Sequence, residues 1–269
     1  MKLGNPVQRW ETVLQPTQSI IQSENPYGAL DALYDQTLTE SLSTKTTPPL
    51  LDTTCRQFRQ LVGSVILLRY PMTCDEISRL LGTDEDADER LIQLLHAVFL
   101  WAEDQPIQIL HPSFPEYLLS AERCSEERLR INGSQQHRHL AFRCLVIINR
   151  NLKPVISDVY ETVTFNSEIL DLKEHLATKA SPELQYACKS WITHLSLASL
   201  DYGYDDDFTA FRTELSTFLS QNTLLWIEMI SLLGALDSAF IGYNKAQTWI
   251  EVSASLMLVY PKLANIEYM

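Results

Sequence analysis

Residues 97–110 read AVFLWAEDQPIQIL, and the hydrophobic pattern changes there from helical to extended. Two short apolar runs, 98–101 and 107–110, flank a polar turn that ends at Pro106, and this arrangement predicts a β-hairpin. Apolar residues at helical spacing predict three short helices before the hairpin. These helices are expected over 56–69, 73–81 and 86–96. Three short helices followed by a hairpin is the order of a winged-helix domain, which we expect over residues 56–124.

Residues that start and stop helices support this division. Thr73 followed by Glu76 matches the capping-box pattern at the start of the second helix. Gly82 is placed to end that helix, because glycine readily adopts the left-handed conformation found after helix ends. The acidic run Thr83–Asp86 then suits the start of the third helix, where the helix dipole favours negative charge.

The first 55 residues are predicted to hold one helix and a linker. Tyr27, Leu30, Tyr34 and Leu38 recur at three- and four-residue steps, which indicates an apolar stripe on a helix. The segment 41–49 is rich in serine and threonine and ends in a double proline, which indicates a loop or linker. We therefore expect a helical segment and a linker over residues 1–55.

From about residue 125 to the end, the pattern is helical throughout. The predicted helices are 137–149, 182–197, 208–219, 223–236 and 246–258. Residues 223–236 are apolar almost all round, which is typical of the central helix of a bundle. The expected fold class is mainly α: a winged-helix domain with one small β-hairpin, followed by an all-α helical bundle over residues 125–269.

The composition excludes several classes of protein. The 269 residues include 34 acidic and 21 basic side chains, a net charge of −13, which argues against a chain-wide nucleic-acid footprint and against anionic membranes. No stretch approaches the roughly 20 apolar residues that cross a bilayer, since Glu228 interrupts the best candidate. The five cysteines are odd in number and form no CxxC pair, so we expect reduced thiols and a cytoplasmic location. Cys144 and Cys188 lie among apolar helical residues, so we expect them to be buried.

Searches for catalytic and metal-binding motifs find none. The chain has no P-loop, no dinucleotide-binding glycine pattern, no zinc-protease helix and no nucleophile elbow. We therefore expect no catalytic residues, no metal site and no enzymatic activity. An unrecognised helical hydrolase remains open as an alternative, which an untargeted activity screen would test.

The winged-helix order also raises the alternative of a nucleic-acid-binding protein. In that fold the third helix enters the major groove and needs cations for the phosphates. Here the third helix begins with three acids and one base, Asp86–Arg90, and residues 56–124 carry 11 acids and 6 bases. We expect such a helix to be repelled by DNA, and an electrophoretic shift at low salt distinguishes the two readings.

His111 is the single candidate site residue. From the residues alone, it is a histidine at the end of the second hairpin strand, bonded to backbone. His137 and His139 are two residues apart and point in different directions on a helix, so they make a poor metal pair.

Several segments, in order, resemble the region just after the nucleotide-binding core of fungal NACHT proteins. These STAND-class signalling ATPases are similar to heterokaryon-incompatibility proteins and to NOD-like receptors. The matching segments are YGALDALY (27–34), VGSVILL (62–68), LHPSFPEYL (110–118), HLAFRCL (139–145), LQYACKSW (184–191) and LLWIEMISLLG (224–234). The resemblance covers roughly residues 5–260.

The resemblance implies the tail of a small helical domain, a winged-helix domain and a helical linker domain. It also implies a role for His111, because the matching histidine of the family's H-x-S-F motif contacts the phosphates of ADP and holds the resting state closed. The NACHT core itself would lie before Met1, so the expectation is a fragment or a truncated member. It would be a regulatory region in innate-immunity or incompatibility signalling, with the NACHT core or other protein domains as partners. ADP or ATP would be a cofactor only with that core attached, and the oligomeric state is left open.

Overall fold

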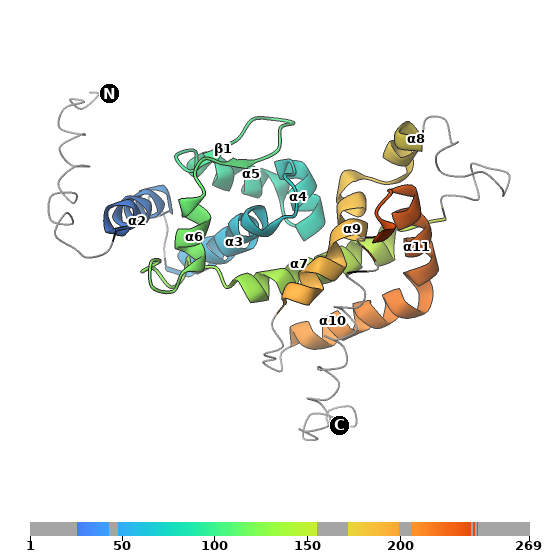
Figure 1. Cartoon of the computed structure of the whole chain (residues 1–269). Helices are drawn as coiled ribbons and strands as arrows, with labels where there is room; N and C mark the ends of the chain where they lie inside the picture. The colour runs from blue at the N-terminus through green and yellow to red at the C-terminus, as the bar shows by residue number, and fades with distance from the viewer. Residues whose placement is uncertain are drawn as a thin grey trace, which may run out of the picture. The chain divides into compact units, whose positions relative to one another are not determined.

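The computed structural model describes residues 26–42, 48–154, 172–198, 206–237, 239 and 241. Over these residues the chain is mainly helical, with one small antiparallel sheet of two strands (Figure 1). Contacts between residues divide the chain into two compact units. Positions 75–83 join the second unit, and the chain otherwise passes from the first unit to the second between Asn132 and Gly133.

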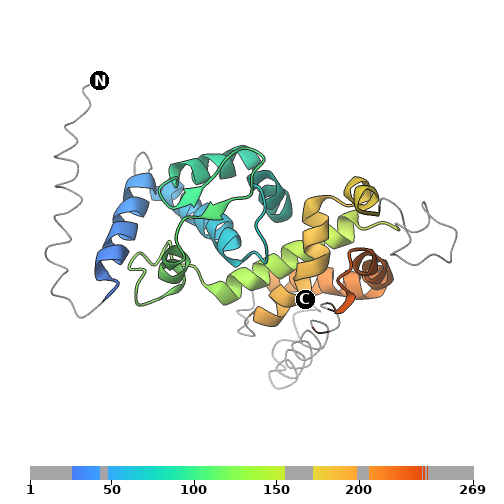
Figure 2. The ribbon, with the colours of Figure 1, turned by 45° about the horizontal axis from the view of Figure 1, so that its top comes forward.

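The first unit contains four helices and a hairpin among its described residues. They are α2 (Gly28–Leu42), α3 (Pro48–Leu67), α5 (Glu85–Leu94), β1 (Phe99–Leu100), β2 (Gln108–Ile109) and α6 (Ser113–Leu119). The predicted hairpin is confirmed: Phe99 pairs with Ile109, and Leu100 pairs with Gln108 (Figure 2). The core of the unit is formed by fully buried side chains of α3, α5, β1 and α6, among them Phe58, Leu61, Ile92, Phe99 and Leu118.

Two helices of this unit differ from their predicted limits. The helix expected over 56–69 starts eight residues earlier, at Pro48. A proline in the first helical turn gives up an N–H that has no partner in the helix, so the double proline begins the helix and does not break it. At the other side, Ser41 and Leu42 belong to α2. The predicted linker 41–49 is therefore wrong at both ends, and its middle, 43–47, lies outside the described residues.

The second unit contains the remaining helices. They are α4 (Cys74–Leu81), α7 (Gly133–Asn151), α8 (Leu172–Lys179), α9 (Pro182–Leu197), α10 (Asp206–Thr217), the π-helical turn Phe218–Asn222 and α11 (Thr223–Leu232). α7 and α9 run antiparallel, since Ser134 donates to the Leu197 carbonyl (3.3 Å) and His137 contacts His194. α8 was not among the predicted helices, and residues 246–258 lie outside the described part of the chain.

Aromatic side chains fill the contact between α9 and α11. Trp191, Phe218 and Trp226 meet with ring centroids 4.7 to 5.8 Å apart, in edge-to-face geometry. The Trp226 indole N–H donates to the Cys188 carbonyl at 2.9 Å. All five cysteines are free and buried, as predicted for Cys144 and Cys188.

α4 is held in the second unit by two arginines. Its Arg79 is paired with the buried Glu183 of α9 at 3.2 Å, and Arg143 of α7 donates to the Leu80 carbonyl at 3.0 Å. Gly82 has φ +66° and Thr83 N–H donates to the Ser78 carbonyl, which is the Schellman end expected at Gly82.

α11 does not match the prediction of a central helix. Trp226, Met229 and Ile230 are buried, but Leu224 is 80% exposed and Ile227 is 44% exposed. An apolar composition all round predicts burial on all sides, but the described chain covers only one side of this helix.

Candidate functional site

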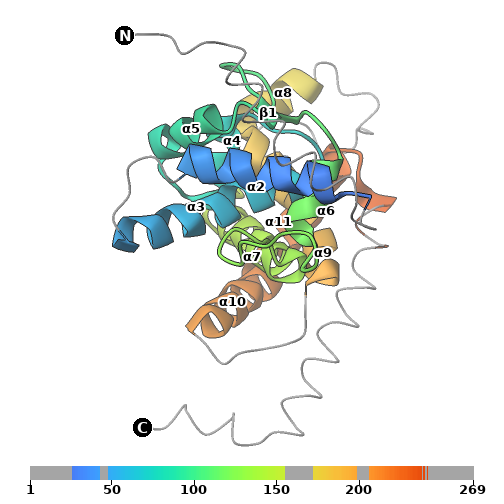
Figure 3. The ribbon, with the colours of Figure 1, turned by 90° about the vertical axis from the view of Figure 1, so that its left-hand side faces the viewer.

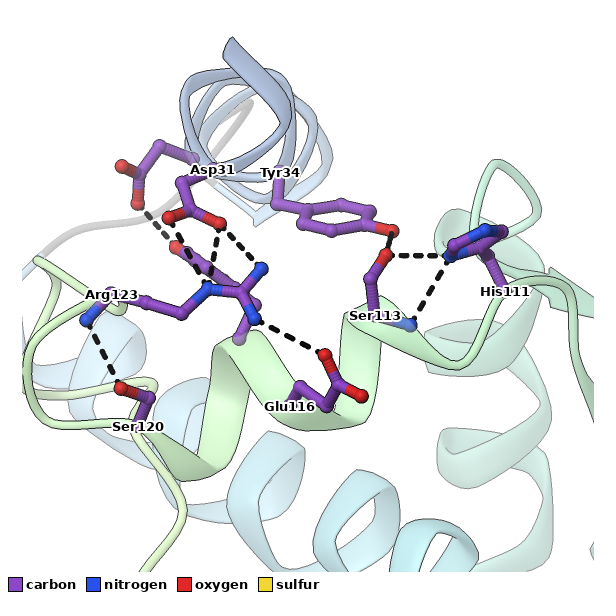
Figure 4. A network of polar contacts seen from close by, with 9 residues as sticks. Asp31, Tyr34, His111, Ser113, Glu116, Ser120 and Arg123 are labelled. Carbon is purple, nitrogen blue, oxygen red and sulfur yellow. Dashed lines mark hydrogen bonds and ion pairs between the residues drawn. The ribbon is translucent and has the colours of Figure 1, made fainter. Parts of the chain in front are cut away.

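His111 lies in the short connection between β2 and α6, and its side chain is exposed. Its Nδ1 atom accepts a hydrogen bond from the backbone N–H of Ser113 (3.2 Å) and lies 2.6 Å from the Ser113 hydroxyl (Figure 4). Because Nδ1 faces a fixed N–H donor, the neutral ring carries its proton on Nε2. The side chain is therefore oriented through one nitrogen and has an N–H donor on the other.

Ser113 connects His111 to α2. The serine is buried, and its hydroxyl lies 2.7 Å from the Tyr34 hydroxyl. When the Ser113 hydroxyl donates to His111, its oxygen accepts from Tyr34, so all three side chains form one chain of hydrogen bonds. The Tyr34 ring packs on Phe114 and Tyr117, with centroids 5.2 and 5.3 Å apart. This contact holds α2 beside α6, as Figure 3 shows.

A second polar cluster joins α2 to the segment after α6. The Arg123 guanidinium makes a two-pronged contact with the buried Asp31 carboxylate, with Nη2–Oδ1 at 2.8 Å and Nε–Oδ1 at 3.1 Å. Its Nη1 atom reaches Glu116 at 3.4 Å, and the guanidinium stacks 4.4 Å over the Tyr27 ring. The hydrogen bonds with Asp31 raise the pKa of Arg123, so this group is cationic throughout the accessible pH range.

Asp35, one turn along α2 from Asp31, receives two hydroxyl groups. Tyr117 donates to its carboxylate, and the Ser125 hydroxyl lies 3.1 and 3.2 Å from the two oxygens. Burial, reinforced by the bond to Asp35, raises the pKa of Tyr117. The phenol therefore stays protonated and keeps its proton for the bond to Asp35.

The sequence identified one member of this network. His111 was selected from the residues, but Tyr34 was placed only as an apolar position, and Ser113, Asp31 and Arg123 had no predicted role. The H-x-S spacing contains the signal for Ser113, since a serine two residues on can reach the histidine. No local signal exists for Asp31 and Arg123, which are 92 residues apart.

The other predicted histidines lie in the second unit. Nδ1 of His137 lies 2.9 Å from Nδ1 of His194, whose Nε2 lies 2.7 Å from the Tyr186 hydroxyl. A contact between two Nδ1 atoms is a hydrogen bond only when exactly one of them carries a proton. Over the described residues, His, Cys, Asp and Glu form no group of three or more suited to a metal ion.

The comparisons with known proteins find no relative. No family model matches the chain, and no curated protein or solved structure matches it. Within the described ranges, none of the helices has the length and apolar character needed to span a membrane.

The network provides an oriented N–H donor on His111, and it provides polar contacts that connect α2 to α6 and to the segment after α6. The exposed Nε2–H of His111 can donate to an anion such as a phosphate oxygen, and the hydroxyls behind it fix the ring. The buried Asp31–Arg123 pair has no group free to attack a substrate, and it holds two segments of the chain together.

Proposed function

We propose that this chain is a non-catalytic regulatory region of a NACHT-type signalling ATPase. In this proposal the region couples the nucleotide state of an upstream core to domain rearrangement and to contacts with other proteins, in the cytoplasm. ADP or ATP belongs to that core, and the chain brings one nucleotide-sensing residue, His111.

The observation that carries the proposal is the way in which His111 is held. Ser113 fixes Nδ1, and the exposed side chain keeps Nε2–H available as a donor. This is the state in which an imidazole recognises a phosphate oxygen, the role that the resemblance to the H-x-S-F motif implies for His111. Phe114 is buried, so it anchors the motif in the core of the first unit.

The order of the elements also supports the winged-helix interpretation of residues 56–124. α3, α4 and α5 precede the hairpin in the order of that fold. Ile107 N–H donates to the Met72 carbonyl at 3.0 Å, so the segment just before α4 contacts the hairpin as a short third strand does in a winged helix.

The hydrogen-bonded chain from His111 to Tyr34 suggests how the nucleotide state reaches the rest of the region. In this proposal a phosphate bound at Nε2 adds to the hold that Ser113 has on the ring, and its release weakens the hydrogen-bonded chain from His111 through Ser113 to Tyr34 on α2. In this proposal α2 is the element that responds to the bound nucleotide.

Calorimetry on the isolated chain tests whether it has a nucleotide site of its own. One histidine donating to a phosphate contributes about 1.5–3 kcal/mol, while millimolar binding already needs about 4 kcal/mol. The net charge of −13 opposes a polyanion further. We expect no heat of binding for ADP or ATP at submillimolar concentration and no ATP turnover. Micromolar binding by residues 1–269 alone would overturn the proposal.

A further inference from the structure

Two histidines of the second unit meet end to end between α7 and α9. Nδ1 of His137 lies 2.9 Å from Nδ1 of His194, and the centroids of the two rings are 5.1 Å apart. The two distances differ by about the diameter of an imidazole ring, so the nitrogens point at each other along the line that joins the rings. This is the geometry of an N–H···N hydrogen bond.

Tyr186 contacts the buried end of this histidine pair. His194 and Tyr186 are both 0% exposed, and the Tyr186 hydroxyl lies 2.7 Å from Nε2 of His194. His137 is only half-buried, so it forms the solvent side of the pair. The three side chains therefore form one line of hydrogen-bonding groups that leads from the surface of the unit to its interior.

The pair has room for one extra proton but not for two. With one proton between the two Nδ1 atoms, the contact is a hydrogen bond both in the neutral pair and in the pair with a single positive charge. In the charged pair, Nε2–H of His194 donates to the Tyr186 hydroxyl, and the last turn of α9, where His194 lies, favours the charge. A second extra proton would place an N–H on both Nδ1 atoms, which would face each other with like charges.

α4 and the first turn of α9 carry acids at the far end of α9 from the pair. Glu183 precedes His194 by about 16 Å along the axis of α9. α4 has Asp75 and Glu76 in its own first turn, and its Arg79 is paired with Glu183 and with Asp75. At that separation along α9, Glu183 is beyond a Debye length from His194 and does not neutralise a second charge there.

α10 and α11 also hold their described carboxylates away from the pair. Glu214 of α10 accepts from Asn149, which is about 18 Å along α7 from His137. Glu228 is two residues from Trp226, whose indole contacts α9, so Glu228 lies on the other side of α11. The charged or titratable side chains that stand closest to the two histidines along α7 and α9 are basic: Arg138, His139, Arg143 and Lys189. These groups oppose a second positive charge on the pair.

We propose that the His137–His194 pair makes the contact between α7 and α9 pH-sensitive, closed while the pair holds at most one extra proton and opened by the second. As pH falls past about 6.5, the ordinary range of histidine, both histidines of the unfolded chain bind a proton, whereas the folded pair binds one in total. The stability of the contact is therefore complete above that range and is lost as pH falls below it. This inference is independent of the proposed function, since it uses no nucleotide and no residue of the first unit.

Hydrogen–deuterium exchange of the full chain at pH 7.5 and pH 5.5, followed by mass spectrometry of peptides within 188–197, tests the proposal. The exchange rate divided by the intrinsic rate at each pH gives the opening constant of this part of α9. In the wild type we expect the opening constant to rise about tenfold from pH 7.5 to pH 5.5, the value for one proton that the folded state does not bind.

Glutamine variants show whether both histidines are required. In His137→Gln and in His194→Gln we expect the rise to be less than about threefold, because the glutamine takes up no proton and its carbonyl can accept from the remaining imidazolium. The matched control is His139→Gln. His139 is two residues from His137, on another side of α7, so the control should keep the tenfold rise.

Three outcomes overturn the proposal. They are a rise below about threefold in the wild type, a tenfold rise that persists in either variant of the pair, and a rise that is lost equally in the His139→Gln control. If a variant of the pair does not fold at pH 7.5, as judged by circular dichroism, a nitrogen-15 NMR titration of the wild-type imidazoles replaces it. His137 and His194 should together take up one proton between pH 8 and pH 5, and uptake of two would equally overturn the proposal.

Discussion

At the residue scale, the ion pair of Asp31 and Arg123 is the contact whose loss should cost the first unit most. The two side chains are only 9 and 13% exposed, and the guanidinium binds the carboxylate through two nitrogens. Replacing one partner leaves the other charge without compensation in a poorly solvated place. The position of α2 therefore depends on this pair as well as on the Tyr34 ring.

Arg123→Ala should lower the free energy of unfolding by about 2–3 kcal/mol, slightly less than for a fully buried pair. The matched control is Arg128→Ala, whose ion pair with Glu126 joins two exposed side chains and should leave the unfolding midpoint essentially unchanged. Urea unfolding followed by circular dichroism measures both. Equal shifts of the two midpoints would show that α2 is not held by the pair.

The sequence pointed to His111, the donor of the candidate site, but not to the side chains that hold the site together. His111 stands out because it follows a strand and because the resemblance gives it a role. Tyr34 reaches His111 through Ser113, and Asp31 and Arg123 form the neighbouring ion pair. These contacts form only when the chain has brought α2 against α6. Pairs so far apart in the sequence leave no periodic or motif signal.

At the scale of single elements, α4 and α11 each end at a glycine in the left-handed backbone conformation, Gly82 and Gly234. The two glycines have different surroundings. A Cβ on Gly82 would clash with Nη2 of Arg143, whereas a Cβ on Gly234 meets nothing within 4 Å. Arg143 donates to the Leu80 carbonyl, so it supports one of the last carbonyls of α4.

We expect Gly234→Ala to cost about 1–2 kcal/mol, the price of the left-handed conformation alone. Gly82→Ala should cost about 1 kcal/mol more, because Arg143 must move and lose its bond to Leu80. Thermal unfolding of the two variants under one buffer gives the comparison. A smaller loss for Gly82→Ala than for Gly234→Ala would refute a structural role of Arg143 at this helix end.

The buried thiols of Cys144 in α7 and Cys188 in α9 should make the free energy of unfolding fall at alkaline pH. Burial raises the pKa of Cys188 to about 12 and also raises that of Cys144. A folded-state pKa above the ordinary value of about 8.5 gives stability that is complete below pH 8.5 and is lost as pH rises towards the folded value. Each thiol should contribute a loss of about 2 kcal/mol between pH 8 and pH 10.

Cys188→Ala tests this pH dependence. Over the same pH interval the variant should lose about 2 kcal/mol less than the wild type, in urea unfolding under a reducing agent that keeps thiols free. Parallel pH profiles for the two proteins would mean that Cys188 ionises in the folded state as readily as in the unfolded one.

The elements were predictable where helix ends carry their own signals. Gly82 ended α4 as expected, and Pro182 began α9 at the predicted residue. α8 was missed because its residues show little apolar periodicity. The strands are shorter than the apolar runs that predicted them, since only two residue pairs form the ladder. Burial of α11 was overestimated because composition cannot show which sides of a helix find partners.

At the scale of the whole molecule, the sequence predicted a mainly helical chain with one hairpin, and the described residues show both. It did not predict that α4, lying in sequence between two helices of the first unit, has its contacts with the second. That assignment follows from Arg79–Glu183 and from Arg143–Leu80, contacts across 104 and 63 residues. The function proposed for the chain also requires two parts, an upstream nucleotide-binding core and this regulatory region.

The rate of ADP release from a chain in which a NACHT core precedes residue 1 tests the central claim most directly. His111→Ala should leave the fold intact and should speed release by about 10- to 100-fold, which corresponds to the loss of about 1.5–3 kcal/mol from one donor to a phosphate. His96→Ala, at another exposed histidine of the first unit, is the control and should release ADP at the wild-type rate. If His111→Ala and His96→Ala release ADP equally slowly, His111 does not sense nucleotide and the proposed coupling is wrong.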